Sequence, residues 1–495
     1  MKNFIPFVFL AAQCWPANAQ LWTSQNDNAR TSANTRETIL TPANVNAARF
    51  GKIFALEVDG DVYAQPLYLA DVDVPGKGRH NVVFVATEHD SVYAFDADGR
   101  SRDPLWHASF LKSGVYTVPA GDVGCGFIRP EIGITPTPVI DLSSGTLYVL
   151  ARTRESLGLL RSERYVQRLH ALAITTGAEK FGGPAVIEAA GFDPVRELPR
   201  AGLLLANGQV YLTWGSSCDI GPYHGWVMAY DARTLTQNAA FNTSPGAAES
   251  GIWQSDNAPA ADEQGNVYVV TGNGKFNRGR DFGDTLLKLH SDGRALAVRD
   301  SFTPANQAEL NAQDLDLGSG GPMLTPDGLV LAGGKNGALY VLDRSKMAAP
   351  RQIFEFRDGI YAAPAYWNGH VYILASGDCL SDFALQAGGL SEKPLATGSH
   401  RFGNPGATPA VSANGSAHGI VWLIETKTWN GADRPAVLHA YDALNVAHEL
   451  YNSEQNPTRD RAGRTLRFTI PTVMNGRVYV EAKGEVDVYG LLPAK

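Results

Sequence analysis

The sequence has few cysteines, few charged residues and, after its first twenty residues, no long apolar run. Only 19% of the 495 residues are charged, and the formal net charge is −8. A nucleic-acid partner is therefore not expected, because phosphate binding needs clustered Lys and Arg, and no such cluster occurs. No segment beyond the N-terminus is long or apolar enough to predict a membrane-spanning helix.

The common catalytic signatures are also missing. The sequence contains no G-x-S-x-G elbow, no H-E-x-x-H motif and no P-loop. It contains no CxxCH either, so no haem c domain is expected to pass electrons onward. Any chemistry must therefore come from side chains that the fold brings together.

The N-terminus predicts an exported protein. Lys2 precedes an apolar run from Phe4 to Ala12, and Ala17-Asn18-Ala19 fits a small-x-small cleavage site. We expect residues 1–19 to be a signal peptide and the mature chain to begin at Gln20. The predicted location is extracellular or periplasmic, and the triplets that begin at Asn242 and Asn414 match the glycosylation signal.

What the sequence has in abundance is turn residues and aromatic strand residues. It contains 51 Gly, 28 Pro, 18 Tyr and 9 Trp, a composition typical of many short strands joined by tight turns. One unit recurs: an x-Pro step, a strand, a turn with Gly or Asn, and a Val- and Tyr-rich strand. Clear copies begin at Pro66, Pro138, Pro259, Pro322, Pro364, Pro409 and Pro471, and a copy at 202–234 lacks the proline.

These eight copies, about 58 residues apart, predict an all-β fold: one eight-bladed β-propeller of four-stranded antiparallel blades over residues 20–495. A β-sandwich or two stacked barrels is the alternative fold. The segments TEHDSVYAFDAD, PEIGITPTPVID, GPYHGWVMAYD and GIWQS resemble the repeat propellers named for pyrroloquinoline quinone (PQQ), such as the quinoprotein alcohol dehydrogenases. The same repeat also serves a non-catalytic outer-membrane assembly lipoprotein, so the resemblance implies the fold more strongly than the chemistry.

Propeller connectivity places the loop before the first strand of a blade, and the loop between its second and third strands, on one face. Cys125 and Cys218 fall in two such loops of adjacent blades, and we expect a Cys125–Cys218 disulfide, with Cys379 unpaired. Three reduced, packed thiols are the alternative. The quinoprotein alcohol dehydrogenases carry a disulfide between neighbouring cysteines against the quinone, and this chain has no Cys-Cys pair.

A PQQ dehydrogenase needs a carboxylate base, a divalent ion such as Ca²⁺, and cationic or amide groups around the cofactor. The resemblance therefore implies roles for polar residues of these loops. The predicted catalytic residues are Glu131, Asp219 and His224, and the predicted metal ligands are Asp314 and Asp316. The predicted cofactor-binding residues are His89, Arg152, Trp226, Gln254, Asn273 and Lys335.

Each candidate also has a purely structural interpretation. An Asp or Asn beside a Gly commonly closes a turn, Trp226 can pack between blades, and His89 can satisfy a buried loop carbonyl. Lys335 is the hardest to explain structurally, because a lone Lys on a tight turn has little structural role.

The sequence leaves three functions open. The first is an exported oxidoreductase that acts on an alcohol or a related small molecule, with PQQ and Ca²⁺ as possible cofactors. The second is a non-catalytic binding or assembly propeller. The third is a polysaccharide lyase or hydrolase that uses His224 with nearby carboxylates. The oligomeric state is not indicated by the sequence.

Overall fold

The computed structural model describes residues 20–157, 162–255, 257–427 and 434–493. The signal peptide predicted for residues 1–19 lies outside the described residues. Within the described residues the chain is nearly all β, as predicted. Helices there are limited to α1 (Ala120–Val123), α2 (Gln307–Ala312), α3 (Pro457–Asp460) and a 3-10 turn at Leu317–Ser319. None of these helices is long and apolar enough to cross a membrane.

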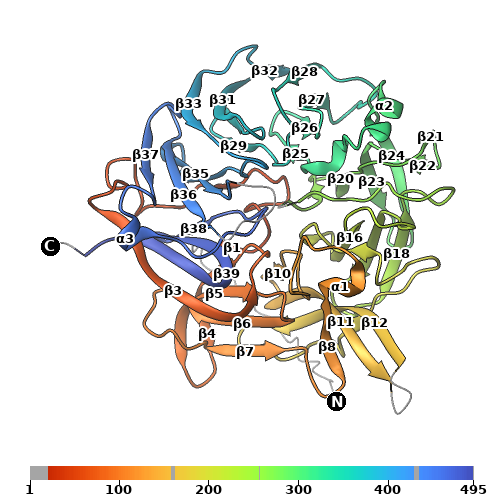
Figure 1. The fold of residues 1–495 in the computed structure, drawn as a ribbon, viewed down its shortest axis with the longest axis horizontal. Helices are drawn as coiled ribbons and strands as arrows, with labels where there is room; N and C mark the ends of the chain where they lie inside the picture. Colours follow the sequence, from red (N-terminus) through yellow and green to blue (C-terminus); the bar gives the residue numbers. More distant parts are fainter. Residues whose placement is uncertain (1–19, 158–161, 256, 428–433, 494–495) are drawn as a thin grey trace, which may run out of the picture.

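The strands form successive sheets, of which the second to the sixth are each built from one stretch of chain, and Figure 1 shows the sheets following one another around the molecule. The first sheet contains β1 (Gln20–Leu21), β4 (Leu67–Val74), β5 (Gly78–Ala86), β6 (Ser91–Asp96) and β7 (Trp106–Ser109). The second contains β8 (Val115–Pro119), β9 (Glu131–Ile132), β10 (Val139–Asp141), β11 (Thr146–Leu157), β12 (Ser162–Ala173) and β13 (Ala185–Val186). The third contains β14 (Glu197–Leu198), β15 (Leu204–Ala206), β16 (Gln209–Ser216), β17 (Trp226–Asp231) and β18 (Gln237–Asn242).

The following sheets repeat this pattern. The fourth contains β19 (Ala260–Ala261), β20 (Asn266–Val270), β23 (Leu286–Ser291) and β24 (Leu296–Phe302), with a hairpin of β21 (Phe276–Asn277) and β22 (Asp281–Phe282) beside it in sequence. The fifth contains β25 (Met323–Leu324), β26 (Leu329–Gly333), β27 (Ala338–Asp343) and β28 (Gln352–Glu355). The sixth contains β29 (Ala365–Trp367), β30 (His370–Ile373), β31 (Cys379–Gln386), β32 (Gly389–Leu390) and β33 (Ala396–Arg401).

The last two sheets join the two ends of the chain. The seventh contains β2 (Ala33–Asn34), β34 (Ala410–Asn414), β35 (Ala417–Glu425), β36 (Val437–Asp442) and β37 (Glu449–Asn452). The eighth contains β3 (Phe50–Asp61), β38 (Thr472–Met474) and β39 (Arg477–Leu491). β3 pairs antiparallel with β39, with Phe50 opposite Leu491, so an N-terminal strand completes the C-terminal sheet. Pairing of this kind protects strand edges that would otherwise stay open.

The apolar runs of the repeat are explained by packing between sheets. In β20, Val267 and Val269 join an apolar cluster shared with the third sheet, whereas Tyr268 and Val270 join one shared with the fifth. Alternate side chains of a strand point to opposite faces, so a strand buried on both faces is apolar at every position. The outermost strand of a sheet has one solvent-exposed face, as the alternating burial of β28 (Gln352–Glu355) shows.

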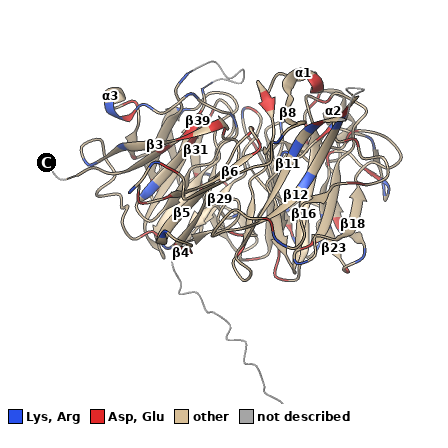
Figure 2. Cartoon of the chain, turned by 90° about the horizontal axis from the view of Figure 1, so that it is seen from below, with Lys and Arg blue, Asp and Glu red and all other residues tan. Residues whose placement is uncertain are grey.

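Long loops carrying the three helices gather on one side of the molecule. In the side view, α1, α2 and α3 lie toward the same edge (Figure 2). Each helix belongs to the segment that precedes the first strand of a repeat unit, namely β10, β25 and β38. These are loops that the sequence predicts to share a face.

Candidate active site

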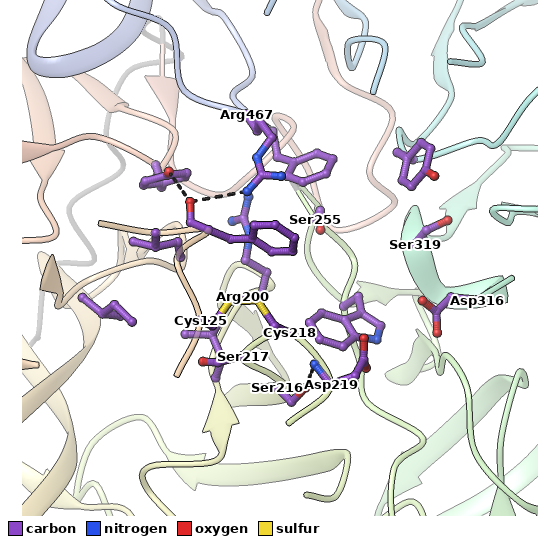
Figure 3. Close-up of a pocket in the computed structure, with 18 of the residues that line it drawn as sticks. Cys125, Arg200, Ser216, Ser217, Cys218, Asp219, Ser255, Asp316, Ser319 and Arg467 are labelled. Carbon is purple, nitrogen blue, oxygen red and sulfur yellow. Dashed lines mark hydrogen bonds between the residues drawn. A yellow bond between two sulfur atoms is a disulfide. The ribbon is translucent and has the colours of Figure 1, made fainter. Parts of the chain in front are cut away.

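A pocket is formed where loops from seven of the sheets converge (Figure 3). It encloses about 840 Å³ between the protein atoms, part of it open to solvent. Its wall is mainly apolar and aromatic, with a few charged groups. The lining residues are Tyr63, Cys125, Phe127, Ile128, Ile132, Leu198, Arg200, Ser216, Ser217, Cys218, Asp219, Trp253, Ser255, Asp316, Ser319, Lys335, Tyr361, Arg467 and Phe468. An apolar concavity with a few convergent polar groups is typical of a small-molecule site.

The repeat explains why these distant residues meet. Tyr63, Ser319, Tyr361 and Phe468 each stand three residues before a proline that begins a repeat unit, and all four line the pocket. In these four units, the first strand therefore starts at a similar place relative to the pocket, and the residue three positions before the proline contributes to the pocket wall.

The predicted Cys125–Cys218 disulfide is confirmed. The two Cα atoms lie 5.7 Å apart, and Cys379 is the free cysteine. Both sulfur-bearing residues line the pocket, and in Figure 3 they lie on the opposite side from Asp316 and Ser319. The disulfide joins a loop of the second sheet to a loop of the third.

Lys335 and two aspartates form the charged centre of the pocket. The Lys335 Nζ atom lies 2.5 Å from Asp316 Oδ2 and 3.0 Å from Asp314 Oδ1. Asn273 completes the group, because its backbone N–H donates to Asp316 Oδ1 at 2.6 Å and its side-chain Nδ2 donates to Asp314 Oδ1 at 2.5 Å. Four of the predicted residues are thus in contact, although Asn273 and Asp314 do not line the pocket.

Burial decides the protonation of this centre. The Asp316 side chain is only 2% exposed, and burial raises its pKa to about 6 even though Lys335 acts in the opposite direction. The pKa of Lys335 is raised because its contacts with the two aspartates outweigh its own burial. Near neutral pH the pair is therefore a carboxylate beside an ammonium group.

A second carboxyl group, that of Asp219, faces the same pocket. Tyr223 donates its hydroxyl hydrogen to Asp219 Oδ1 at 2.6 Å, and loss of surrounding water raises the pKa of Asp219. The Tyr223 ring meets Trp253 edge-on, with ring centroids 6.4 Å apart. Trp253 Nε1 is buried and has no hydrogen-bond partner. A donor of this kind is available to a bound ligand.

Two arginines of the pocket were not predicted. The Arg467 guanidinium lies 4.4 Å from the ring centroid of Phe127, and Arg200 lies 5.5 Å from that of Phe468. Burial lowers the pKa of Arg467. Arg200 precedes the repeat unit that lacks its proline, and Arg467 precedes the last unit. The expectation that loops before the first strand of a blade share one face, applied to these two units, would have identified both arginines.

His89 and Glu131 lie together but outside this pocket. His89 Nδ1 is 2.8 Å from Glu131 Oε1, and Thr117 donates to Glu131 Oε2 at 2.7 Å. Glu131 lines a neighbouring hollow that also contains Glu88, Arg129 and other charged residues. Glu131 therefore lies outside the pocket that Asp219 lines, although both were predicted as catalytic residues.

The remaining predicted residues have structural contacts. Arg152 is fully buried and donates from Nη2 to the carbonyl of Val195 at 2.5 Å. Trp226 packs in the core beside Phe192, as the structural interpretation expects.

Gln254 and His224 are likewise held by the fold. Gln254 is buried and accepts a hydrogen bond from the Val270 N–H at 3.0 Å. His224 Nδ1 lies 3.1 Å from Ser244 Oγ, and the backbone N–H of His224 donates to Glu197. None of the four predicted residues Arg152, Trp226, Gln254 and His224 lines the pocket.

No family model matches the chain, and no curated protein matches it in sequence. Its fold is similar to that of quinohemoprotein alcohol dehydrogenase ADHIIG from Pseudomonas putida HK5, with a TM-score of 0.64 and 14% identity over 96% of this chain and 81% of that chain. A europium-containing methanol dehydrogenase gives a TM-score of 0.55 and 13% identity over 93% and 81% of the two chains. BamB from Moraxella catarrhalis gives 0.51 and 15% over 89% and 99%. At these identities the likeness shows the fold alone, a PQQ-like β-propeller fold.

Proposed function

We propose that residues 20–495 form one eight-bladed propeller, with each sheet as a blade, and that the chain is an exported, quinoprotein-like oxidoreductase of an alcohol or related small molecule. The observation that carries the proposal is the Asp316–Lys335 pair at the wall of an aromatic pocket. The likeness to two alcohol dehydrogenases supports the reaction class. The disulfide supports export, because disulfides persist in oxidising compartments. The signal peptide and the glycosylation of Asn242 and Asn414 stay predictions.

The pocket suits a planar, anionic cofactor such as PQQ. Lys335, Arg200 and Arg467 supply positive charge, and Trp253 supplies an aromatic surface and a buried N–H without a partner. Arginine and lysine bind carboxylates, and aromatic faces stack on flat rings. When bound, PQQ would supply the two-electron oxidation of the substrate.

A divalent ion fits less well at the predicted ligands. Asp314 and Asp316 both contact the Lys335 ammonium group, which already offsets one of their two negative charges. A Ca²⁺ ion at this position would have to displace that contact, since calcium needs six to eight oxygen ligands. We therefore assign no step to a metal at Asp314 and Asp316.

Asp316 is the group best suited to take a proton from the substrate hydroxyl. With a pKa of about 6, the carboxylate is largely ionised at neutral pH and is still a stronger base than an exposed aspartate. The backbone N–H of Asn273 fixes Oδ1, and Lys335 holds Oδ2. The Lys335 ammonium group would also stabilise substrate or cofactor oxygen atoms that become more negative during the reaction.

The test is reconstitution of the purified chain with PQQ, with and without Ca²⁺, followed by tryptophan fluorescence and dye reduction on a panel of alcohols. We expect saturable quenching and alcohol-dependent dye reduction. Asp316→Asn should lower kcat by about 10²–10⁴, because it removes the base. Asp103→Asn, an exposed matched control, should behave as the wild type.

Absence of both quenching and dye reduction, with either Ca²⁺ or a lanthanide present, would overturn the proposal. That outcome would favour the second candidate, a non-catalytic binding propeller. The likeness to BamB, which extends over 99% of that chain, supports this alternative.

A further inference from the structure

A group of metal-ligating side chains lies outside the pocket, between the sixth and seventh sheets. His400 is on β33 of the sixth sheet, whereas Glu425 ends β35 and His439 is on β36 of the seventh. The ligand atoms of all three lie within 4.8 Å of one another. Among the residues that the structure describes, no other group of three His, Cys, Asp or Glu side chains brings its ligand atoms as close.

The two distances from Glu425 suit a tetrahedral metal ion, and the two histidine nitrogens lie within 4.8 Å of each other, so they would have to move closer together around an ion. Glu425 Oε2 is 3.1 Å from His400 Nε2 and 3.4 Å from His439 Nε2. Ligands about 2.0–2.1 Å from a tetrahedral zinc ion lie about 3.3 Å from one another. Two imidazoles and one carboxylate form a donor set that zinc prefers.

A buried nitrogen points into the group. The His439 side chain is 3% exposed, and its Nε2 lies 3.4 Å from Glu425 Oε2, an ion-pair contact without hydrogen-bond geometry. Its other nitrogen, Nδ1, donates to Glu449 Oε1 at 2.7 Å, and Asn452 in turn donates to Glu449 Oε2 at 3.0 Å. A carboxylate on one nitrogen of a histidine orients the lone pair of the other toward a metal.

The remaining contacts hold the ligands in place. The backbone N–H of Gly403 donates to Glu425 Oε1 at 2.9 Å, which leaves Oε2 for the group. The Phe402 ring lies 4.8 Å from the His400 ring and 5.0 Å from the His439 ring and forms an apolar wall. His400 is 38% exposed, so an ion can enter from solvent.

We propose that His400, Glu425 and His439 bind one Zn²⁺ ion, which links the sixth and seventh sheets and leaves a fourth position for water. The site is independent of the pocket, because none of its ligands lines that pocket. The ion would clamp two neighbouring sheets together. Binding to the folded state alone would raise the Tm.

The test is a zinc titration of the full chain after treatment with a chelator, with a chromophoric competitor as the probe. We expect one zinc ion per chain and a zinc-dependent rise in Tm. His400→Ala should weaken binding at least 100-fold and abolish the rise in Tm. Glu449→Gln should weaken binding about 10–100-fold through the orientation of His439.

His418→Ala is the matched control, because His418 is exposed on the same strand, β35, and lies outside the group. It should bind zinc as the wild type does. Cobalt substitution should give the visible absorption of a four-coordinate ion, and His400→Ala should lose it. His400→Ala, at a partly exposed position, keeps the test decisive if a variant of buried His439 does not fold. If zinc does not bind saturably, or binds the wild type and His400→Ala equally, the three residues form only ion pairs and the proposal is overturned.

Discussion

Replacing Cys125 and Cys218 together with serine removes a cross-link between residues 93 apart in sequence. In the chain-entropy model, closing a loop of this length lowers the entropy of the unfolded state, which stabilises the folded state by about 4.7 kcal/mol at 25 °C. With an unfolding entropy of about 2.1 cal/mol/K per residue, this loss corresponds to a decrease in Tm of roughly 5 °C for a chain of this size. The bond also joins the second and third sheets, so its loss frees two loops of the pocket.

The assay is differential scanning calorimetry of the wild type, the double variant and Cys379→Ser, which replaces the free cysteine. We expect the double variant to melt several degrees below the wild type and Cys379→Ser to melt with it. Reduction of the wild type should reproduce the double variant, and added reductant should leave the double variant unchanged. A double variant that melts within 1 °C of the wild type would refute the entropic reasoning, as would an equal loss in Cys379→Ser.

Two further predictions concern buried charges. Lys335→Met should lower the free energy of unfolding by about 3–5 kcal/mol, because buried Asp316 loses its cation. Adding Asp316→Asn to Lys335→Met should restore part of the lost stability. Thermal denaturation measures both effects, and an unchanged Tm in Lys335→Met would contradict the prediction. Burial raises the pKa of Glu88 to about 7, above its unfolded value of about 4.3, so the folded state holds an extra proton between these values. Stability should therefore fall by up to about 3–4 kcal/mol as pH rises from about 4 to 7. Glu88→Gln should reduce this slope in denaturant titrations, whereas exposed Glu392→Gln should not; equal slopes in all three proteins would contradict the assignment.

The all-β fold could be predicted because its signals are local. Turn residues and Val- and Tyr-rich strands recur at each repeat, and each quoted copy falls within a separate sheet. The pairing of β3 with β39 was not predicted. It depends on strands more than 400 residues apart, and no local pattern links them.

The candidate site was predicted only in part. Asp219, Asp316, Lys335 and the disulfide line the pocket, because the loop rule places them on one face. Loops that share a face can still send their side chains into different hollows. Glu131 lines a neighbouring hollow, and His89 contacts Glu131. Arg200 and Arg467 were not predicted, because the expectation that loops before the first strand of a blade share one face was not applied to their two repeat units.

By itself, the sequence determined the strand-rich repeat, the loops that share a face and the one cross-link between them. Only the tertiary structure decided which polar side chains face the pocket and which are buried in contacts of their own, such as Arg152 on the carbonyl of Val195. It also decided that His400, Glu425 and His439 meet between two sheets. The physical reason is that strand patterns follow from nearest neighbours along the chain, whereas the direction and ionisation of a side chain depend on the packing of residues far apart in sequence.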